Sequence, residues 1–179
     1  MFLNPNAAYA EKRKRALHLA AVFIFTFLVM VTLLRAISQT LFFTVRVDGS
    51  SMNPILQNGN VVGVNRLAEI QRGSIVVAQT QSGTSIVKRV IALPGETVWS
   101  VQGRVYISGP HGNLTLTEDY VLPENAGGQD VPRTEVPSGN VFLLGDNRAV
   151  SLDSRSFGPV PIENVMGVVT EFWLSHKFS

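Results

Sequence analysis

Cysteine and lysine usage limits the chemistry that this chain of 179 residues can perform. The absence of cysteine excludes a thiolate nucleophile, a disulfide framework and a cysteine-ligated metal. None of the three histidines, His18, His111 and His176, lies in a motif typical of a Ser-His-Asp triad or a metal site. The lysines are Lys12, Lys14, Lys88 and Lys177. Only Lys88 lies within an apolar run, which makes it the candidate catalytic base.

The residues around Lys88 favour a strand over Ser85–Ile91, because β-branched side chains predominate there. Alternation with period 2 places Lys88 on the same face as Ile86 and Val90. If that face is buried, desolvation favours the neutral amine. Lowering the pKa from about 10.4 to the range of a useful base takes about 4 kcal/mol. A neutral amine can accept the proton of a serine hydroxyl. The alternative is a solvated lysine on a half-buried strand.

A glycine-serine turn between Val47 and Leu56 offers such a hydroxyl. Gly49 permits backbone angles that other residues rarely adopt, and Pro54 restricts the residue before it to extended geometry. A turn of this kind can direct a serine hydroxyl and a backbone N–H toward one point. By itself it could equally be an ordinary surface loop, so its interpretation depends on the motifs that follow.

Three motifs follow one another along the chain. They are Ser51-Met52-Asn53-Pro54, then Lys88-Arg89-Val90-Ile91-Ala92-Leu93-Pro94-Gly95, then residues 145–158 with the sequence Gly-Asp-Asn-Arg-Ala-Val-Ser-Leu-Asp-Ser-Arg-Ser-Phe-Gly. In this order, behind one apolar span, they resemble the type I signal peptidase family. The resemblance runs from about Val45 to Gly167. It implies a mainly β catalytic domain of the signal peptidase type with one N-terminal transmembrane helix.

The resemblance also implies a Ser/Lys dyad. Ser51 stands at the position of the nucleophile and Lys88 at that of the general base, in agreement with the burial argument. Ser151 stands at the position of a hydroxyl that orients the lysine amine by a hydrogen bond. The backbone N–H of Ser51 is expected to stabilise the oxyanion. Some members carry a second donor where this chain has Gly49, so the second donor is left open. No metal or cofactor is expected.

Two further groups of residues take roles from the resemblance. Ion-pairing residues that scaffold the site are Asp146, Arg148, Asp153 and Arg155, with Arg89 as a candidate partner. Residues expected to line substrate pockets are Val45, Val47, Gly49, Met52, Leu56, Ile86 and Val87. Ordinary core packing is a compatible role for the apolar members of the second group.

The N-terminal segment predicts a membrane anchor. Four consecutive basic residues, 12–15, precede a run from Ala16 to Leu34 that contains no Asp, Glu, Lys or Arg and is long enough to span a bilayer. The positive-inside rule then makes residues 1–15 a cytoplasmic stub, 16–36 the anchor and 37–179 an extracytoplasmic catalytic domain. A buried core helix is one alternative. The other is a cleaved signal peptide, because Ala36-Ile37-Ser38 resembles a small-x-small cleavage site.

The remaining chain predicts many short strands and no further convincing helix. The expected strands are 42–47, 60–64, 74–78, 85–91, 97–101, 104–107, 140–144 and 165–170. Turn residues separate them, as in sandwich or barrel-like folds. Residues 108–138 are richer in Gly, Pro, Asn and acidic side chains, so a loose excursion or a small subdomain is expected there.

Charge distribution argues against nucleic-acid binding. The net charge is +2 with an isoelectric point near 9.2, but the chain after Arg35 carries 10 basic and 12 acidic residues. The basic excess is therefore a topology signal.

These features together predict a single-pass plasma-membrane endopeptidase. It would remove signal peptides from secreted preproteins by cutting after small residues at −3 and −1. The bilayer and the secretion translocon are candidate partners. The alternatives are a specialised or self-processing Ser/Lys protease with few substrates and a non-enzymatic anchored binding module.

Overall fold

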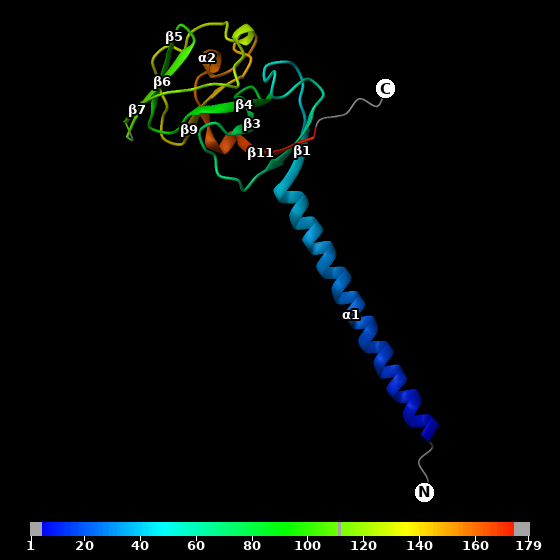
Figure 1. The fold of residues 1–179 in the computed structure, drawn as a ribbon. Coiled ribbons are helices and arrows are strands. Elements are labelled where there is room, and N and C mark those ends of the chain that lie inside the picture. The colour runs from blue at the N-terminus through cyan, green and yellow to red at the C-terminus, as the bar shows by residue number, and fades with distance from the viewer. Residues whose placement is uncertain (1–4, 111, 174–179) are drawn as a thin grey trace, which may run out of the picture. The chain divides into compact units, whose positions relative to one another are not determined.

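A computed structural model describes residues 5–110 and 112–173, and the chain divides into two compact units at Leu41 (Figure 1). The first unit is helix α1, Pro5–Leu41, which has 37 residues. Its segment Glu11–Ser38 is long and apolar enough to cross a membrane, and none of its side chains is buried. The predicted anchor, 16–36, lies inside this segment.

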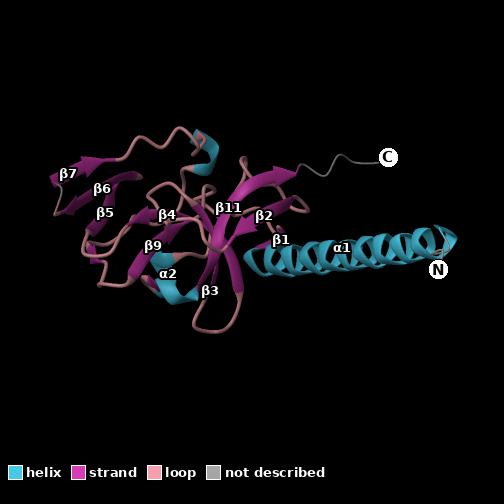
Figure 2. Ribbon diagram, turned by 90° about the horizontal axis from the view of Figure 1, so that it is seen from below, coloured by secondary structure: helices cyan, strands magenta, loops and turns pink. Residues whose placement is uncertain are grey.

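The second unit contains a seven-stranded sheet whose strands pair antiparallel in the order β1-β2-β11-β3-β4-β9-β10 (Figure 2). Its strands are β1 (Phe42–Arg46), β2 (Val61–Asn65), β3 (Ile75–Gln79), β4 (Ser85–Ala92), β9 (Asn140–Leu144), β10 (Val160–Pro161) and β11 (Val165–Trp173). Strand β4 lies between β3 and β9, so its residues are placed by neighbours on both sides. The prediction of a mainly β domain is confirmed.

A second, four-stranded sheet has the order β7-β6-β5-β8. Its strands are β5 (Thr97–Val101), β6 (Arg104–Gly109), β7 (Gly112–Thr115) and β8 (Thr134–Glu135). The predicted excursion over 108–138 thus supplies both edge strands of this sheet, and it also contains a short 3-10 helix, Pro123–Asn125. The two edge strands, β7 and β8, are too short and too polar to show a strand pattern in the sequence.

A four-residue helix, α2 (Ser154–Phe157), was not expected from the sequence and follows the last motif. Asp153 caps it: one of its carboxylate oxygens accepts a hydrogen bond from the Arg155 N–H at 3.2 Å. One turn is too short to show helical periodicity. A second 3-10 helix, Ile162–Asn164, precedes β11.

Strand β4 contributes to the core on both of its faces. Val90 packs with Val76 and Leu143, whereas Ile91 packs with Phe142 and the inner residues of the second sheet. A strand buried on both sides has little freedom to shift, because close-packed interiors resist displacement. This strand carries Lys88.

Candidate active site

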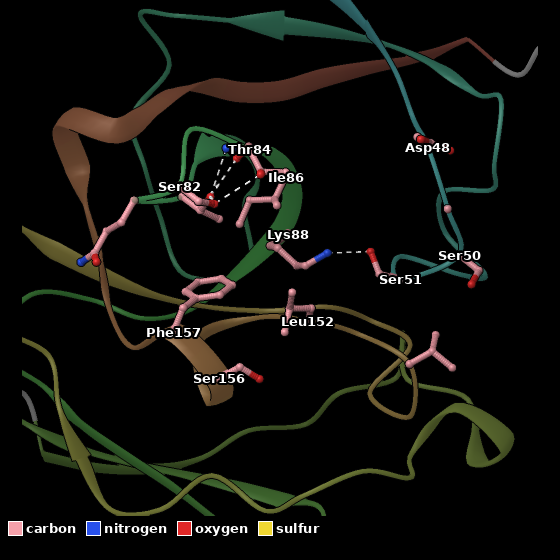
Figure 3. A pocket seen from close by; sticks show the side chains of 14 residues that line it. Asp48, Ser50, Ser51, Ser82, Thr84, Ile86, Lys88, Leu152, Ser156 and Phe157 are labelled. Carbon is pink, nitrogen blue, oxygen red and sulfur yellow. Dashed lines mark hydrogen bonds between the residues drawn. The ribbon is translucent and has the colours of Figure 1, made fainter.

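Ser51 and Lys88, 37 residues apart in the sequence, meet in space. Lys88 Nζ donates a hydrogen bond of 2.6 Å to Ser51 Oγ and another of 3.1 Å to the Val87 carbonyl. Figure 3 shows the two side chains pointing toward one another across a pocket. The hydroxyl and the amine are within the distance needed for direct proton transfer.

The turn that carries Ser51 is fixed from three sides. Gly49 has a φ of 88°, in the region that favours glycine, and its N–H donates to Asn58 Oδ1 at 2.9 Å. Behind Ser51, Met52 and Leu56 are each only 1% exposed and anchor the turn in the core. The Asn147 N–H donates to the Ser51 carbonyl at 3.0 Å. The last motif therefore holds the first one directly.

Lys88 is unusual for a lysine because its side chain is buried. Among the described residues, no carboxylate lies within hydrogen-bond distance of its amine. Lys88 is 4% exposed. Burial lowers the pKa of Lys88 from 10.5 to about 8, against the opposing charges of Asp153 and Asp146. A lysine with this pKa is partly neutral near physiological pH and can serve as a base.

The predicted hydrogen bond between Ser151 and Lys88 is absent from this structure. Ser151 Oγ is buried and has no hydrogen-bond partner among the described residues. The hydroxyl instead packs against Gly145: a Cβ built there would lie 2.5 Å from the Ser51 carbonyl oxygen and closer still to Ser151 Oγ. Gly145 is thus a site residue that sequence reasoning missed, although it opens the third motif.

Two of the expected scaffold residues, Asp146 and Asp153, are paired with arginines. Asp146 accepts two bonds from Arg89, 2.8 Å from Nε and 2.6 Å from Nη2, in the bidentate geometry that fixes both groups. Asp153 is paired with Arg155 at 2.8 Å and also accepts the Gly145 N–H at 3.1 Å. Burial alone would raise the pKa of Asp153, but these two donors hold it below its ordinary value.

The fourth scaffold residue, Arg148, contacts the segment 108–138, for which the sequence predicts only a loose excursion or a small subdomain. Its guanidinium pairs with Glu118, and its Nε donates to the Gly145 carbonyl at 3.0 Å. Tyr120 donates to Glu118 at 2.8 Å and places its ring 4.0 Å from the Arg89 guanidinium. Burial, followed by the charge of Glu118, raises the pKa of Tyr120. Nothing in the sequence indicates that Glu118 and Tyr120 belong to the site.

A pocket of about 710 Å³ adjoins the Ser51–Lys88 pair. Of the seven residues predicted to line substrate pockets, Gly49 and Ile86 line this one. The other five, Val45, Val47, Met52, Leu56 and Val87, belong to a hydrophobic cluster beneath the turn instead. Alternation along β1 and β4 turns Val45 and Val87 toward this cluster. Val47, Met52 and Leu56 lie outside these strands and are buried where the turn packs on the core.

Apolar and hydroxyl side chains that the sequence gave no reason to select complete the pocket wall. They are Val150, Leu152 and Phe157 from the last motif and Thr80, Ser82 and Thr84 from the tip of the β3–β4 hairpin. Val150 and Leu152 are more than half exposed although they are apolar. The pocket therefore presents apolar side chains beside Ser51 and Lys88.

A serine hydroxyl beside a buried lysine amine, in a mainly β domain, is an arrangement of groups expected in a serine hydrolase. The family described as "Signal peptidase, peptidase S26" matches residues 19–174, and the chain belongs to this family of serine proteases. The resemblance inferred from the three motifs is confirmed.

Individual relatives agree with this assignment. The chain is 32% identical to signal peptidase I V of Bacillus subtilis (strain 168) over 160 residues, which span 80% of this chain and 92% of the relative. It is 36% identical to signal peptidase I of Bacillus caldolyticus over 151 residues, 74% of this chain and 80% of the relative. The crystal structure of a signal peptidase I from Enterococcus faecalis V583 is similar, with a TM-score of 0.50 and 35% identity, and the match covers 57% of this chain and 98% of that one.

Proposed function

We propose that this protein is a membrane-anchored endopeptidase that removes signal peptides from secreted preproteins through a Ser51/Lys88 dyad. The observation that carries the proposal is the 2.6 Å separation between Ser51 Oγ and an amine that is only 4% exposed. Family membership supports the substrate class. The residues assigned to the reaction rest on the geometry of this chain.

In the proposed reaction, neutral Lys88 takes the hydroxyl proton while Ser51 Oγ attacks the carbonyl carbon of the residue at −1. The Ser51 N–H, which has no acceptor among the described residues, donates to the developing oxyanion. The C–N bond breaks, and the Lys88 ammonium protonates the leaving amine of the mature protein. Lys88 then activates a water molecule that hydrolyses the acyl-enzyme and restores Ser51.

The proposed specificity for small residues at −3 and −1 follows from an extended substrate. In a β-strand, residues two apart point to the same face. A peptide lying along the site as a strand would therefore present both small side chains to the enzyme, and its backbone would be available for pairing.

We assign helix α1 the role of a plasma-membrane anchor with its N-terminus in the cytoplasm. Its segment Glu11–Ser38 could span the bilayer, and the basic residues 12–15 lie at its N-terminal end. Because the chain has no cysteine, Ala10→Cys and Ser138→Cys each introduce a unique thiol. An impermeant maleimide applied to intact spheroplasts should label Cys at 138 and not at 10; the reverse pattern would refute this orientation.

The dyad is tested with a preprotein that carries an Ala-x-Ala cleavage site and with purified full-length enzyme in detergent. Ser51→Ala and Lys88→Met should each lower kcat/KM by at least about a thousandfold. Ser50→Ala, which removes the neighbouring hydroxyl, should keep kcat/KM within about tenfold of the unsubstituted enzyme. Cleavage by Ser51→Ala would refute the dyad. A panel of unrelated precursors separates a general enzyme from a specialised one, and a binding module would cut none of them.

A further inference from the structure

The segment 118–128 lies against the third motif at both of its ends. Near its start, Glu118 accepts a hydrogen bond of 3.1 Å from Arg148 Nη1. Near its end, a Cβ built at Gly128, whose φ is 109°, would lie 2.5 Å from the Arg148 carbonyl oxygen. Only glycine fits so close an approach with this backbone conformation, so the segment is held tightly on Arg148 and its neighbours.

Asn125 lies between these two ends and bonds to both catalytic motifs. Its carbonyl accepts the Ala149 N–H at 3.3 Å, and its side-chain Nδ2 donates to the Asn53 carbonyl at 3.3 Å. A carbonyl oxygen can only accept, so the atom that faces Asn53 must be the amide nitrogen. Asn53 lies two residues after Ser51, and among the described residues its carbonyl accepts no other hydrogen bond. Asn125 therefore joins the first motif to the third.

The backbone of Asn125 is fixed by the 3-10 helix that it ends. This helix begins with Pro123, whose ring fixes φ and whose missing N–H would have no partner in a first turn. The Asn125 N–H donates to the Leu122 carbonyl at 2.8 Å, and the Asn125 carbonyl is bonded to Ala149. Both backbone groups are thus engaged, and only two side-chain torsions remain to vary. The amide is therefore presented to Asn53 from a fixed position.

Resting on the function proposed above, we propose that Asn125 is a positioning residue that sets the place of Ser51 Oγ relative to Lys88. Arg89, next to Lys88, pairs with Leu144 at the end of β9, and the third motif starts at the following residue. The third motif is therefore placed in register with the strand that carries the lysine. Its Asn147 N–H holds the turn at the Ser51 carbonyl, and Asn125 holds the same turn two residues later. Two bonds fix the direction of the turn, whereas one would leave it free to pivot.

Loss of the bond from Asn125 should affect the reaction step and not the binding of substrate. Rates fall steeply when reacting atoms leave their aligned positions, and a displacement of about 1 Å can cost about a hundredfold. Asn125 does not line the pocket beside Ser51, so the contacts available to a substrate there would stay as they are. We therefore expect a change in kcat with little change in KM.

The test compares three variants of the full-length enzyme in detergent, with a preprotein that carries an Ala-x-Ala cleavage site. Asn125→Asp keeps the shape of the side chain but places an oxygen against the Asn53 carbonyl, and Asn125→Ala removes the amide. Both should lower kcat about tenfold and leave KM within about threefold of the unsubstituted value. Glu124→Ala is the matched control, because Glu124 is the exposed preceding residue of the same 3-10 helix, and it should leave kcat unchanged.

A pH profile separates positioning from a general loosening of the site. The surroundings of Lys88 stay the same if Asn125 only positions the turn. Half-maximal kcat/KM should then be reached at the same pH as in the unsubstituted enzyme, with only the plateau lowered. If the substitution instead admitted water to Lys88, burial would no longer lower the pKa of its amine, and the profile would shift to higher pH.

Urea unfolding, followed by tryptophan fluorescence, gives the folded fraction of each variant, and kcat is calculated per folded molecule. Full kcat in Asn125→Asp would overturn the proposal, because it would show that the side chain only fills space. A loss of kcat accompanied by a profile shifted to higher pH would also overturn it. In both cases cleavage of the preprotein by the unsubstituted enzyme leaves the proposed function standing. If the unsubstituted enzyme does not cut the preprotein, the proposed function itself fails.

Discussion

Replacing Lys88 by methionine should stabilise the fold at neutral pH, and by an amount that depends on pH. The pKa of Lys88 is about 8 in the folded protein, against 10.5 for an ordinary lysine. Below pH 8 both states carry the proton, and the folded state bears the full penalty of a buried charge. Between pH 8 and 10.5 the folded state releases the proton, so the penalty declines. Methionine has a similar volume and carries no charge.

The magnitude follows from the difference between the two pKa values. About 2.5 pKa units correspond to about 3 kcal/mol at pH 7, and the same linkage leaves about 1 kcal/mol at pH 10. Lys88 donates hydrogen bonds to Ser51 and to the Val87 carbonyl that methionine cannot form. Their loss changes the free energy of unfolding by the same amount at both pH values. The stability difference between variant and unsubstituted protein should therefore shift by about 2 kcal/mol between pH 7 and 10.

Urea unfolding of the full-length chain in detergent, followed by tryptophan fluorescence, measures this difference. Arg104→Met removes an exposed cation from β6 and serves as the control, with the same stability change expected at both pH values. A Lys88→Met difference that stays constant between pH 7 and 10 would refute the lowered pKa and with it the electrostatic basis of the proposed dyad.

Three further predictions concern the site. Because the proposed reaction needs neutral Lys88, kcat/KM for a preprotein should rise about tenfold per pH unit below pH 8 and level off above it, and a flat profile from pH 6 to 9 would contradict a lysine base. Gly145→Ala should lower kcat at least about tenfold, since its Cβ would lie 2.5 Å from the Ser51 carbonyl; unchanged kcat in steady-state assays would show that the turn yields without moving the nucleophile. Asp146→Asn should lower the free energy of unfolding by about 3–5 kcal/mol because it leaves Arg89 buried without its anion, and a loss below 1 kcal/mol in urea titrations would contradict that.

Much of the site could be predicted because its signals are local. A lone lysine in a β-branched run predicts strand β4, and the three motifs together favour a buried amine over a solvated one; the structure has both. The glycine-serine turn likewise predicts a φ that glycine favours, as found at Gly49. These inferences need only residue type and spacing.

The rest depends on contacts between distant segments, which a single sequence does not encode in its spacing. Glu118 and Tyr120 lie in a polar stretch without periodicity, and their role arises only where Arg148 and Arg89 meet them. The direction of Met52 and Leu56, into the core and away from the pocket, depends on how the turn packs over β2 and β3. Ser151 could be located in a motif, but the hydrogen bond predicted between it and Lys88 is not formed in this structure, because rotation about one side-chain bond decides whether it forms.

The hydrogen bond from Asn147 to the Ser51 carbonyl also bears on timing during biosynthesis. The turn that carries Ser51 is synthesised early. The segment that contains Asn147 emerges from the ribosome only when most of the chain has been synthesised. Until β9 and the third motif are in place, Lys88 lacks one neighbouring strand and Ser51 lacks its backbone donor. A nascent chain that has not folded therefore holds both reactive groups without their alignment. Hydrolysis would begin only after the whole domain has folded, so this enzyme would need no removable inhibitory segment to remain inactive during its own synthesis.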